Sequence, residues 1–226
     1  MKKVFLGVGH GGTDPGAVVG ALKEKDLNVQ IALSLGRELK RHGVEVVYSR
    51  TLDVTEQLSD KIKRCNEAAP DLALDIHNNA GGGDGAEIYH HYGGGVGKKL
   101  AENILSEMVK AGQNSRGAKV KKNSNGRDYF AFIRDTACPA VIVECAFLDN
   151  EKDVLTVSTE GARKNVATAI CKGILTTLGI AYVEPKPEAK VIYRVQVGAY
   201  SQRENAVKMQ EKLKKAGFDA IIKEGE

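Results

Sequence analysis

The chain has 226 residues, which is enough for one sizeable core and a small appendage. Hydrophobic residues make up 42% of it and charged residues 27%, a composition that excludes a disordered or fibrous protein. The formal net charge is only +4 and the basic residues form no block, so we expect neither nucleic acid nor a membrane as a partner.

The start of the chain is not typical of an exported protein. The apolar run after Met1-Lys2-Lys3 ends before His10, whereas a signal peptide needs about 7–15 apolar residues and a cleavage site of small residues. No apolar run is long enough to span a membrane. We therefore expect a protein that is made in the cytoplasm without a signal peptide, and that must be released if it acts outside the cell.

Apolar periodicity predicts alternating strands and helices along most of the chain. The predicted strands cover residues 4–8, 44–50, 71–77, 85–92 and 140–147, and the predicted helices cover residues 26–41, 59–69, 98–112 and 160–178. The segment 140–147 is almost wholly apolar, so we expect it near the centre of the sheet. The alternation predicts an α/β fold with a largely parallel sheet flanked by helices on both faces.

The composition and the periodicity of the sequence change after Gly179. Residues 180–190 contain two prolines and mixed charges without periodicity, which is typical of a linker. After them come a strand pattern over 193–200, an amphipathic helix pattern over 203–216 and a strand pattern over 218–223. We therefore predict a main domain over 1–179, a linker over 180–190, and a small β-α-β unit within 191–226.

Polar residues stand where several of the predicted strands end. His10 follows the first strand, His77 ends the third, and Asn78-Asn79 come directly after it. In largely parallel sheets, ligands bind at the carboxyl ends of the strands. A lone histidine at a strand end is most often a hydrogen-bonded structural residue, but this convergence favours a site.

Two imidazoles with one carboxylate are typical of a catalytic zinc centre whose fourth position is open. Glu24 precedes the first predicted helix, shortly after the glycine-rich loop that holds His10. Glu144 lies inside an apolar strand, where an ionised side chain is costly unless it is paired. Two explanations remain open: Glu144 transfers protons beside a metal, or it pairs with an arginine elsewhere.

Three blocks of the sequence resemble the signature blocks of the zinc-dependent N-acetylmuramoyl-L-alanine amidases of the amidase-3 group. The blocks are GHGGTDPGAVVG with KEKDLN, then LDIHNNA, then PAVIVECAFLDN, within residues 3–179. The resemblance implies a Zn²⁺ ion held by His10, Glu24 and His77, with Glu144 as the catalytic residue. It implies hydrolysis of the amide between N-acetylmuramic acid and L-alanine in peptidoglycan, by an endolysin or autolysin that reaches the cell wall after release.

The blocks depart from the usual pattern of that family at two positions. Asp75 stands where serine is more usual, and Ala146 stands where glycine is more usual. Asp75 either holds His77 in place or is an exposed strand end, and Asn79 is a second candidate neighbour of the site. We expect the glycines around His10 to keep the wall of the site open for a bulky glycopeptide.

The tail resembles the first half of the sporulation-related repeat (SPOR) domain, which binds peptidoglycan glycan strands. The similar stretch is YRVQVGAYSQRENAVKMQEKLKKAGFDAIIK. Half a domain is too small to bury an adequate core alone. Three interpretations remain open: the other half lies outside this sequence, the half-domain docks on the main domain, or two chains pair their halves in a homodimer.

Two other functions stay open on the sequence. The first is a peptidoglycan-binding protein without catalysis, although the four candidate site residues are all intact. The second is a zinc peptidase that cuts between amino acids of the stem peptide. The amines that appear on digestion of the wall distinguish these functions from the amidase.

Overall fold

The computed structural model describes residues 1–185, 193 and 195–224. Its contacts divide the chain into two compact units, Met1–Val183 and Glu184–Glu226. The first unit is an α/β sandwich, as predicted. Among the described helices, none combines the length and apolar character needed to cross a membrane.

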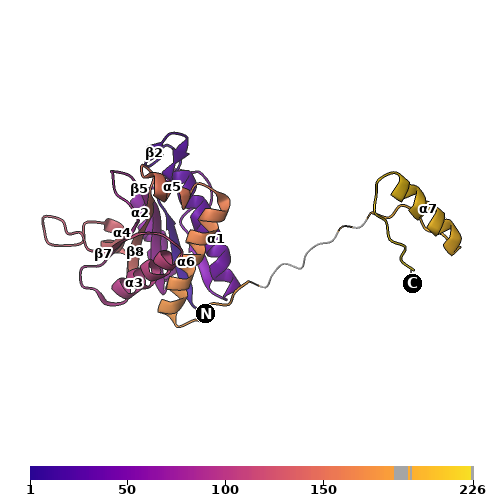
Figure 1. Cartoon of the computed structure of the whole chain (residues 1–226). Coiled ribbons are helices and arrows are strands. Elements are labelled where there is room, and N and C mark those ends of the chain that lie inside the picture. The colour runs from indigo at the N-terminus through magenta and orange to yellow at the C-terminus, as the bar shows by residue number, and fades with distance from the viewer. Residues whose placement is uncertain (186–192, 194, 225–226) are drawn as a thin grey trace. The chain divides into compact units, whose positions relative to one another are not determined.

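A six-stranded sheet forms the middle layer of the first unit (Figure 1). Its strands are β1 (Lys3–Val8), β4 (Glu45–Tyr48), β5 (Leu72–Asn79), β6 (Ala86–His90), β7 (Ser115–Lys119) and β8 (Ala140–Phe147). The order across the sheet is β4-β1-β5-β8-β6-β7, and the first four of these are parallel. β6 runs antiparallel to β8, and β7 is parallel to β6. The predicted largely parallel sheet is confirmed, with the apolar strand β8 inside it.

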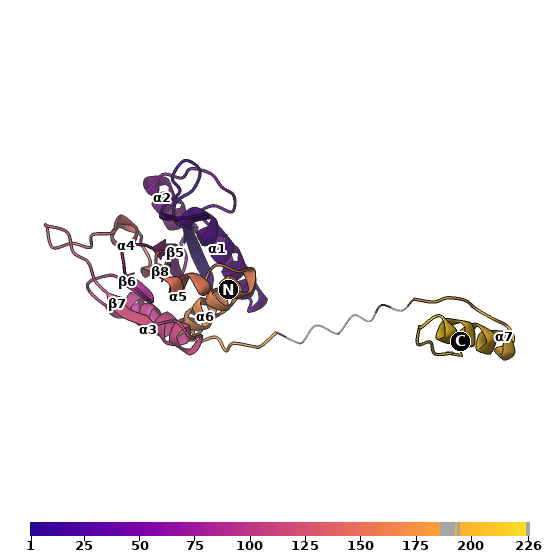
Figure 2. The ribbon, with the colours of Figure 1, turned by 45° about the horizontal axis from the view of Figure 1, so that its top comes forward.

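Helices cover both faces of the sheet (Figure 2). The helices of the first unit are α1 (Glu24–Arg41), α2 (Leu58–Ala68), α3 (Gly95–Lys110), α4 (Ala131–Asp135), α5 (Glu151–Leu155) and α6 (Glu160–Leu178). α1, α3 and α6 contribute to the larger core, in which Leu35, Ile104 and Ile170 are fully buried. α2 and α4 cover the other face, over a smaller cluster that includes Cys65 and Phe132.

The smaller apolar cluster lies on the face of the sheet that carries the candidate site. Side chains alternate between faces along a strand, so His77 and Asp75 share the face of Ala73, which belongs to that cluster. By the same alternation, Glu144 shares the face of Ile142 on the neighbouring strand. Polar groups therefore follow directly after apolar ones on this face, towards the carboxyl ends of β5 and β8.

The structure contains several short elements that the sequence did not predict. They are a hairpin of β2 (Val18–Val19) and β3 (Leu22–Lys23), the strand β7, and the five-residue helices α4 and α5. The two strands of the hairpin and the helices α4 and α5 are too short for a periodic pattern to appear in their sequences. β7 is a polar edge strand interrupted by Gly117, so it lacks the apolar run of a central strand.

The second unit contains α7 (Arg203–Lys215), close to the predicted helix. The prediction of two strands flanking this helix is wrong within the described residues, because residues 195–200 and 218–223 form no strand. Val195 is 91% exposed and Ile221 is 81% exposed, so these segments bury no sheet face in this unit. Residues 186–192 and 194, which include half of the predicted linker, lie outside the described residues.

The residues just after Gly179 belong to the first unit rather than to the linker. Ile180 and Tyr182 pack against its core, and the Tyr182 hydroxyl donates a hydrogen bond to Glu38 at 2.8 Å. The backbone N–H of Val183 donates to His42 at 3.0 Å. The first unit therefore extends to Val183, four residues beyond the predicted boundary at 179.

Candidate active site

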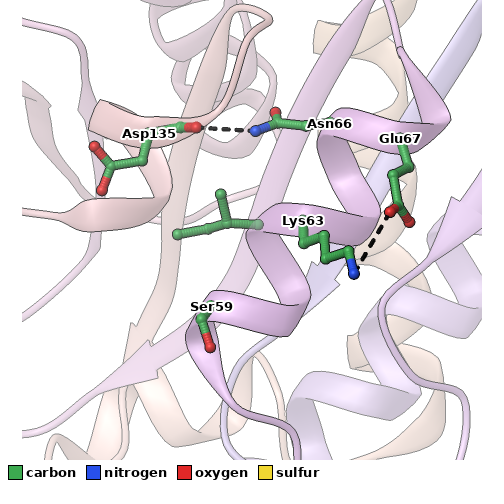
Figure 3. A pocket seen from close by; sticks show the side chains of 6 residues that line it. Ser59, Lys63, Asn66, Glu67 and Asp135 are labelled. Carbon is green, nitrogen blue, oxygen red and sulfur yellow. Dashed lines mark hydrogen bonds and ion pairs between the residues drawn. The ribbon is translucent and has the colours of Figure 1, made fainter.

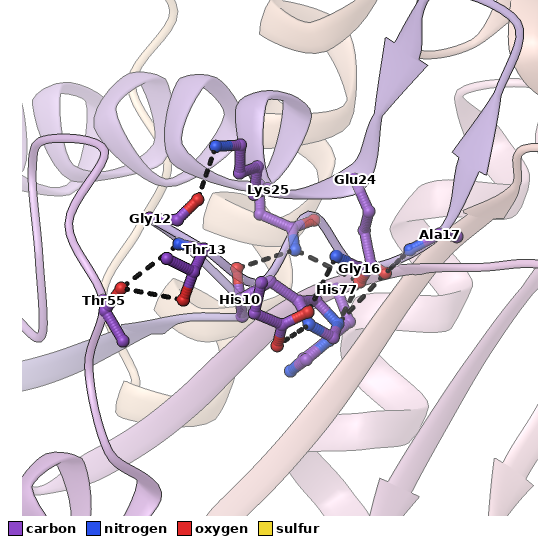
Figure 4. A network of polar contacts seen from close by, with 12 residues as sticks. His10, Gly12, Thr13, Gly16, Ala17, Glu24, Lys25, Thr55 and His77 are labelled. Atoms are coloured by element: carbon purple, nitrogen blue, oxygen red, sulfur yellow. Dashed lines mark hydrogen bonds and ion pairs between the residues drawn. The ribbon is translucent and has the colours of Figure 1, made fainter.

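His10, Glu24 and His77 form a cluster at the carboxyl ends of β1 and β5, which we call the His–Glu–His cluster (Figure 4). One ligand atom from each residue lies within 4.8 Å of the others. Glu24 lies between the imidazoles, with Oε2 at 3.1 Å from His10 Nε2 and Oε1 at 3.0 Å from His77 Nδ1. His10 and His77 are far apart in the sequence, and the parallel strands β1 and β5 bring them together because their carboxyl ends share one edge. Glu24 joins them as the first residue of α1.

The glycines of the first loop make room for the side chains of the site itself. A Cβ on Gly9 would lie 2.2 Å from the His77 ring, and one on Gly16 would lie 2.4 Å from Glu24 and 2.6 Å from His10. His10 has a φ of +60°, an uncommon conformation for a residue with a side chain. The expectation that the glycines leave an open wall for substrate is therefore corrected at Gly9 and Gly16, which pack against the cluster.

Each member of the cluster is held by a polar neighbour. Asp14 Oδ2 lies 2.7 Å from His10 Nδ1 and so orients that ring. Glu24 accepts hydrogen bonds from the backbone N–H of Asn78 at 3.0 Å and from the Asn28 side chain at 3.2 Å. The role of Asn28 could not be seen from its place in the sequence alone, although an amide on the apolar stripe of α1, fully buried in the structure, is a signal for such a role.

A buried ion pair lies beneath His77. Asp75 Oδ2 is 3.5 Å from His77 Nε2, and the Asp75 carboxylate accepts from Lys61 Nζ at 2.9 and 3.1 Å. Lys61 also donates to the carbonyl of Val8 at 3.2 Å. Asp75 is 3% exposed, so it is not an exposed strand end.

The electrostatics of the cluster favour shared protons. Burial alone would lower the pKa of His77, but the carboxylates of Asp75 and Glu24 outweigh burial and raise it to about 10. A hydrogen bond to Glu24 likewise raises the pKa of His10. Burial would raise the pKa of Glu24, yet the two imidazoles hold that pKa well below its ordinary value. A metal ion at these three residues would take the place of the imidazole protons.

Replacing Lys61 with methionine is expected to lower the free energy of unfolding by about 3–5 kcal/mol, because Asp75 would remain buried without its partner. Urea unfolding followed by circular dichroism measures this loss. Lys63→Met is the matched control, since Lys63 lies on the same helix with its side chain 74% exposed. Its expected change is below about 1 kcal/mol, and equal losses for both variants would contradict a special role of Lys61.

Glu144 lies beside the cluster on β8, where it pairs in register with His77 of β5. Its side chain is half-buried, and loss of hydration raises its pKa to about 7. Within the part of the chain that the structure describes, it has no hydrogen bond and no ion pair, so the alternative of an arginine partner finds no support. Glu144 is therefore a carboxyl that can exchange a proton near neutral pH.

Asn79 lies next to a different carboxylate. Its amide donates to Glu87 Oε1 at 3.2 Å, and its side-chain oxygen accepts from the backbone N–H of Ala80 at 2.8 Å. Glu87, on β6, is 3% exposed and lies opposite Glu144 across the antiparallel pair of strands. Asn79 thus contacts the far side of the site rather than the His–Glu–His cluster.

An open hollow on the surface between α2 and α4 is separate from this site (Figure 3). Asn66 donates to the carbonyl of Asp135 at 3.0 Å there, and Lys63 forms an ion pair with Glu67 at 3.9 Å. The residues that line it are Ser59, Ile62, Lys63, Asn66, Glu67 and Asp135. None of them belongs to the His–Glu–His cluster, so the hollow contributes nothing to its chemistry.

The chain matches two protein families. The family described as N-acetylmuramoyl-L-alanine amidase (Amidase_3) matches residues 4–176, and the SPOR domain matches residues 172–224. The chain is 32% identical to N-acetylmuramoyl-L-alanine amidase CwlM of Bacillus licheniformis, over 98% of this chain and 85% of that protein. It is 33% identical to the sporulation-specific N-acetylmuramoyl-L-alanine amidase of Bacillus subtilis (strain 168), over 98% of this chain and 84% of that protein.

Solved structures agree with these matches. The catalytic domain of CwlV, an N-acetylmuramoyl-L-alanine amidase from Bacillus (Paenibacillus) polymyxa var. colistinus, superimposes with a TM-score of 0.72. The two are 30% identical, and the match covers 80% of this chain and 100% of that domain. The chain therefore belongs to the Amidase_3 family of N-acetylmuramoyl-L-alanine amidases, and it is a peptidoglycan amidase with a C-terminal SPOR domain.

Proposed function

We propose that His10, Glu24 and His77 hold a Zn²⁺ ion and that Glu144 is the catalytic acid and base of the amidase. The proposal is carried by the His–Glu–His cluster beside a carboxyl that has no partner in the described structure. Two imidazoles and one carboxylate are the donor set of a catalytic zinc centre, and their ligand atoms are close enough to share one ion. When bound there, zinc would polarise the lactyl carbonyl and make an attacking water more acidic.

The chain's own residues supply the proton transfers. Glu144 accepts a proton from the attacking water and then donates it to the amine nitrogen of L-alanine as the amide bond breaks. Burial raises the pKa of Glu144 to about 7 in the protein alone, and a bound dication would lower it, so that the carboxyl is ionised at neutral pH and can first act as the base. Asp14 and Asp75 lie against the imidazoles and fix their orientation, while Asn28 fixes Glu24.

Digestion of purified peptidoglycan by the full chain is expected to release stem peptides with a new N-terminal alanine. Mass spectrometry with amine labelling identifies that product. New amines within the stem peptide would instead indicate a zinc peptidase, and no new amine would indicate a binding protein without catalysis. Either of these outcomes would contradict the amidase reaction.

For the tail, we propose that two chains pair their SPOR segments on the glycan strand. Apolar side chains of the second unit support such pairing, because Tyr193 is 89% exposed, Val195 is 91% exposed and Ile221 is 81% exposed. A partner segment would bury them in a shared interface between the two chains.

That the enzyme reaches the wall by release from the cytoplasm stays a prediction.

A further inference from the structure

A second polar cluster lies beside Glu144, on the strands at the edge of the sheet. Glu87 is its centre and accepts hydrogen bonds at Oε1 from the Tyr89 hydroxyl at 2.9 Å and from Asn79 at 3.2 Å. At Oε2 it accepts from Arg116 Nε at 2.8 Å and from Lys119 Nζ. We call these five residues the Glu87 cluster. Both side-chain oxygens of Glu87 thus accept hydrogen bonds. The two positive charges of Arg116 and Lys119 face only this one negative charge within the Glu87 cluster.

A bulge in β7 brings both cations to the same carboxylate. Arg116 and Lys119 are three residues apart, so in a regular strand their side chains would point to opposite faces of the sheet. The register of β7 against β6 shifts between Ala86 and Ile88, and Gly117 has a φ of +88° at this point. A left-handed glycine is typical of such a bulge, and the extra residue returns Lys119 to the face of Arg116.

The cations stay accessible although Glu87 is buried. The side chain of Arg116 is 37% exposed and that of Lys119 is 31% exposed, against 4% for Glu87. Arg116 lies over the Phe147 ring, 5.0 Å from its centroid, and uses only Nε in its bond to Glu87. Its two terminal NH₂ groups have no hydrogen bond among the described residues. A fixed guanidinium with a free terminal edge is well suited to bind a carboxylate.

The position of the cations fits the stem peptide that leaves the site. The sheet order places β7 two strands from β8, which corresponds to about 10 Å. An extended peptide advances about 3.4 Å per residue, so two residues beyond the scissile amide span about 7 Å, within reach of an arginine side chain. Glu144 protonates the amine of the first of these residues in the proposed function, on which this inference rests.

We propose that Arg116 and Lys119 bind the free carboxylate of the second stem-peptide residue. The Glu87 cluster is then a specificity subsite on the leaving-group side of the reaction. It favours stem peptides whose second residue keeps an ionised carboxylate over those in which that carboxylate is an amide. Glu87 fixes the two cations in place, and the bulge at Gly117 sets their direction.

The test compares two otherwise identical substrates. Uncrosslinked glycan strands are prepared with D-isoglutamate or with D-isoglutamine as the second stem residue, and kcat/KM is measured for the full chain on each. The wild-type enzyme is expected to prefer the isoglutamate form by about 10- to 100-fold, the worth of a charge-assisted hydrogen bond. Arg116→Gln and Lys119→Gln are expected to reduce this ratio towards one, mainly by lowering kcat/KM for the isoglutamate form.

The ratio separates binding from damage to the fold, because a partly unfolded enzyme loses activity on both substrates alike. The double variant Glu87→Gln/Arg116→Gln, which leaves no unpaired buried carboxylate, is expected to lose the preference as well. Lys98→Gln, an exposed lysine on α3, is the control and should keep it. No wild-type preference, or equal losses on both substrates, would overturn the subsite. Failure of the wild-type enzyme to cleave either form would overturn the proposed function and the subsite with it.

Discussion

Replacing Glu144 with glutamine is expected to lower kcat by about 100- to 10,000-fold and to leave the bound metal in place. Glutamine has nearly the same shape but cannot accept a proton from water or return it to the leaving amine. Glu144 lies beside His77 in register and is not part of the His–Glu–His cluster, so its replacement removes none of the proposed ligands. Lysis kinetics and metal content, measured on the same preparation, check both parts of this result.

The pH dependence of the rate gives a second measure of Glu144. The carboxyl must be ionised to act as a base, so kcat/KM should fall as the pH falls through its pKa. Burial raises that pKa to about 7 in the protein alone, and the charge of a nearby dication would lower it from there. The fall of kcat/KM at low pH should therefore have its midpoint below about pH 7 in the wild-type enzyme. Glu160→Gln changes an exposed carboxylate and is the control, which should keep both the wild-type rate and the wild-type pH profile. A Glu144→Gln enzyme with the wild-type rate would contradict a role of Glu144 in the mechanism.

Alanine at either imidazole of the cluster is expected to abolish lytic activity. His10→Ala and His77→Ala each leave two of the three proposed ligands, and the remaining pair is expected to bind zinc much more weakly. Dialysis against increasing chelator, followed by metal analysis and lysis assays, measures the loss. His42→Gln is the control, because His42 contacts Glu38 and Val183 and takes no part in the cluster. A His10→Ala protein that retains both zinc and lytic activity would contradict the assignment of His10.

Strong periodicity explains which parts of the fold could be predicted. The helix 160–178 has the same bounds in the sequence-based expectation and in the structure, since its buried stripe repeats over five turns. The apolar run at 140–147 likewise fixed both the position of β8 and its place inside the sheet. His10 and His77 could be placed near each other because each lies at the end of an apolar strand and parallel strands end at one edge.

Features that depend on long-range contacts could not be predicted. The partnership of Lys61 with Asp75 joins a helix to a strand, and nothing near either residue in the sequence indicates it. The bulge at Gly117 appears only when β7 pairs with β6. The two strand patterns of the tail show the opposite failure, because alternation alone predicted strands where the described residues offer no sheet to complete them.

Metal analysis of the freshly purified, lytically active full chain decides whether the His–Glu–His cluster is a zinc site. We expect about one zinc ion per chain, lost together with activity on chelation and restored together with it when zinc is returned. The expectation follows from His10, Glu24 and His77, whose ligand atoms lie within 4.8 Å of one another. A fully active preparation that contains no stoichiometric transition metal would contradict it.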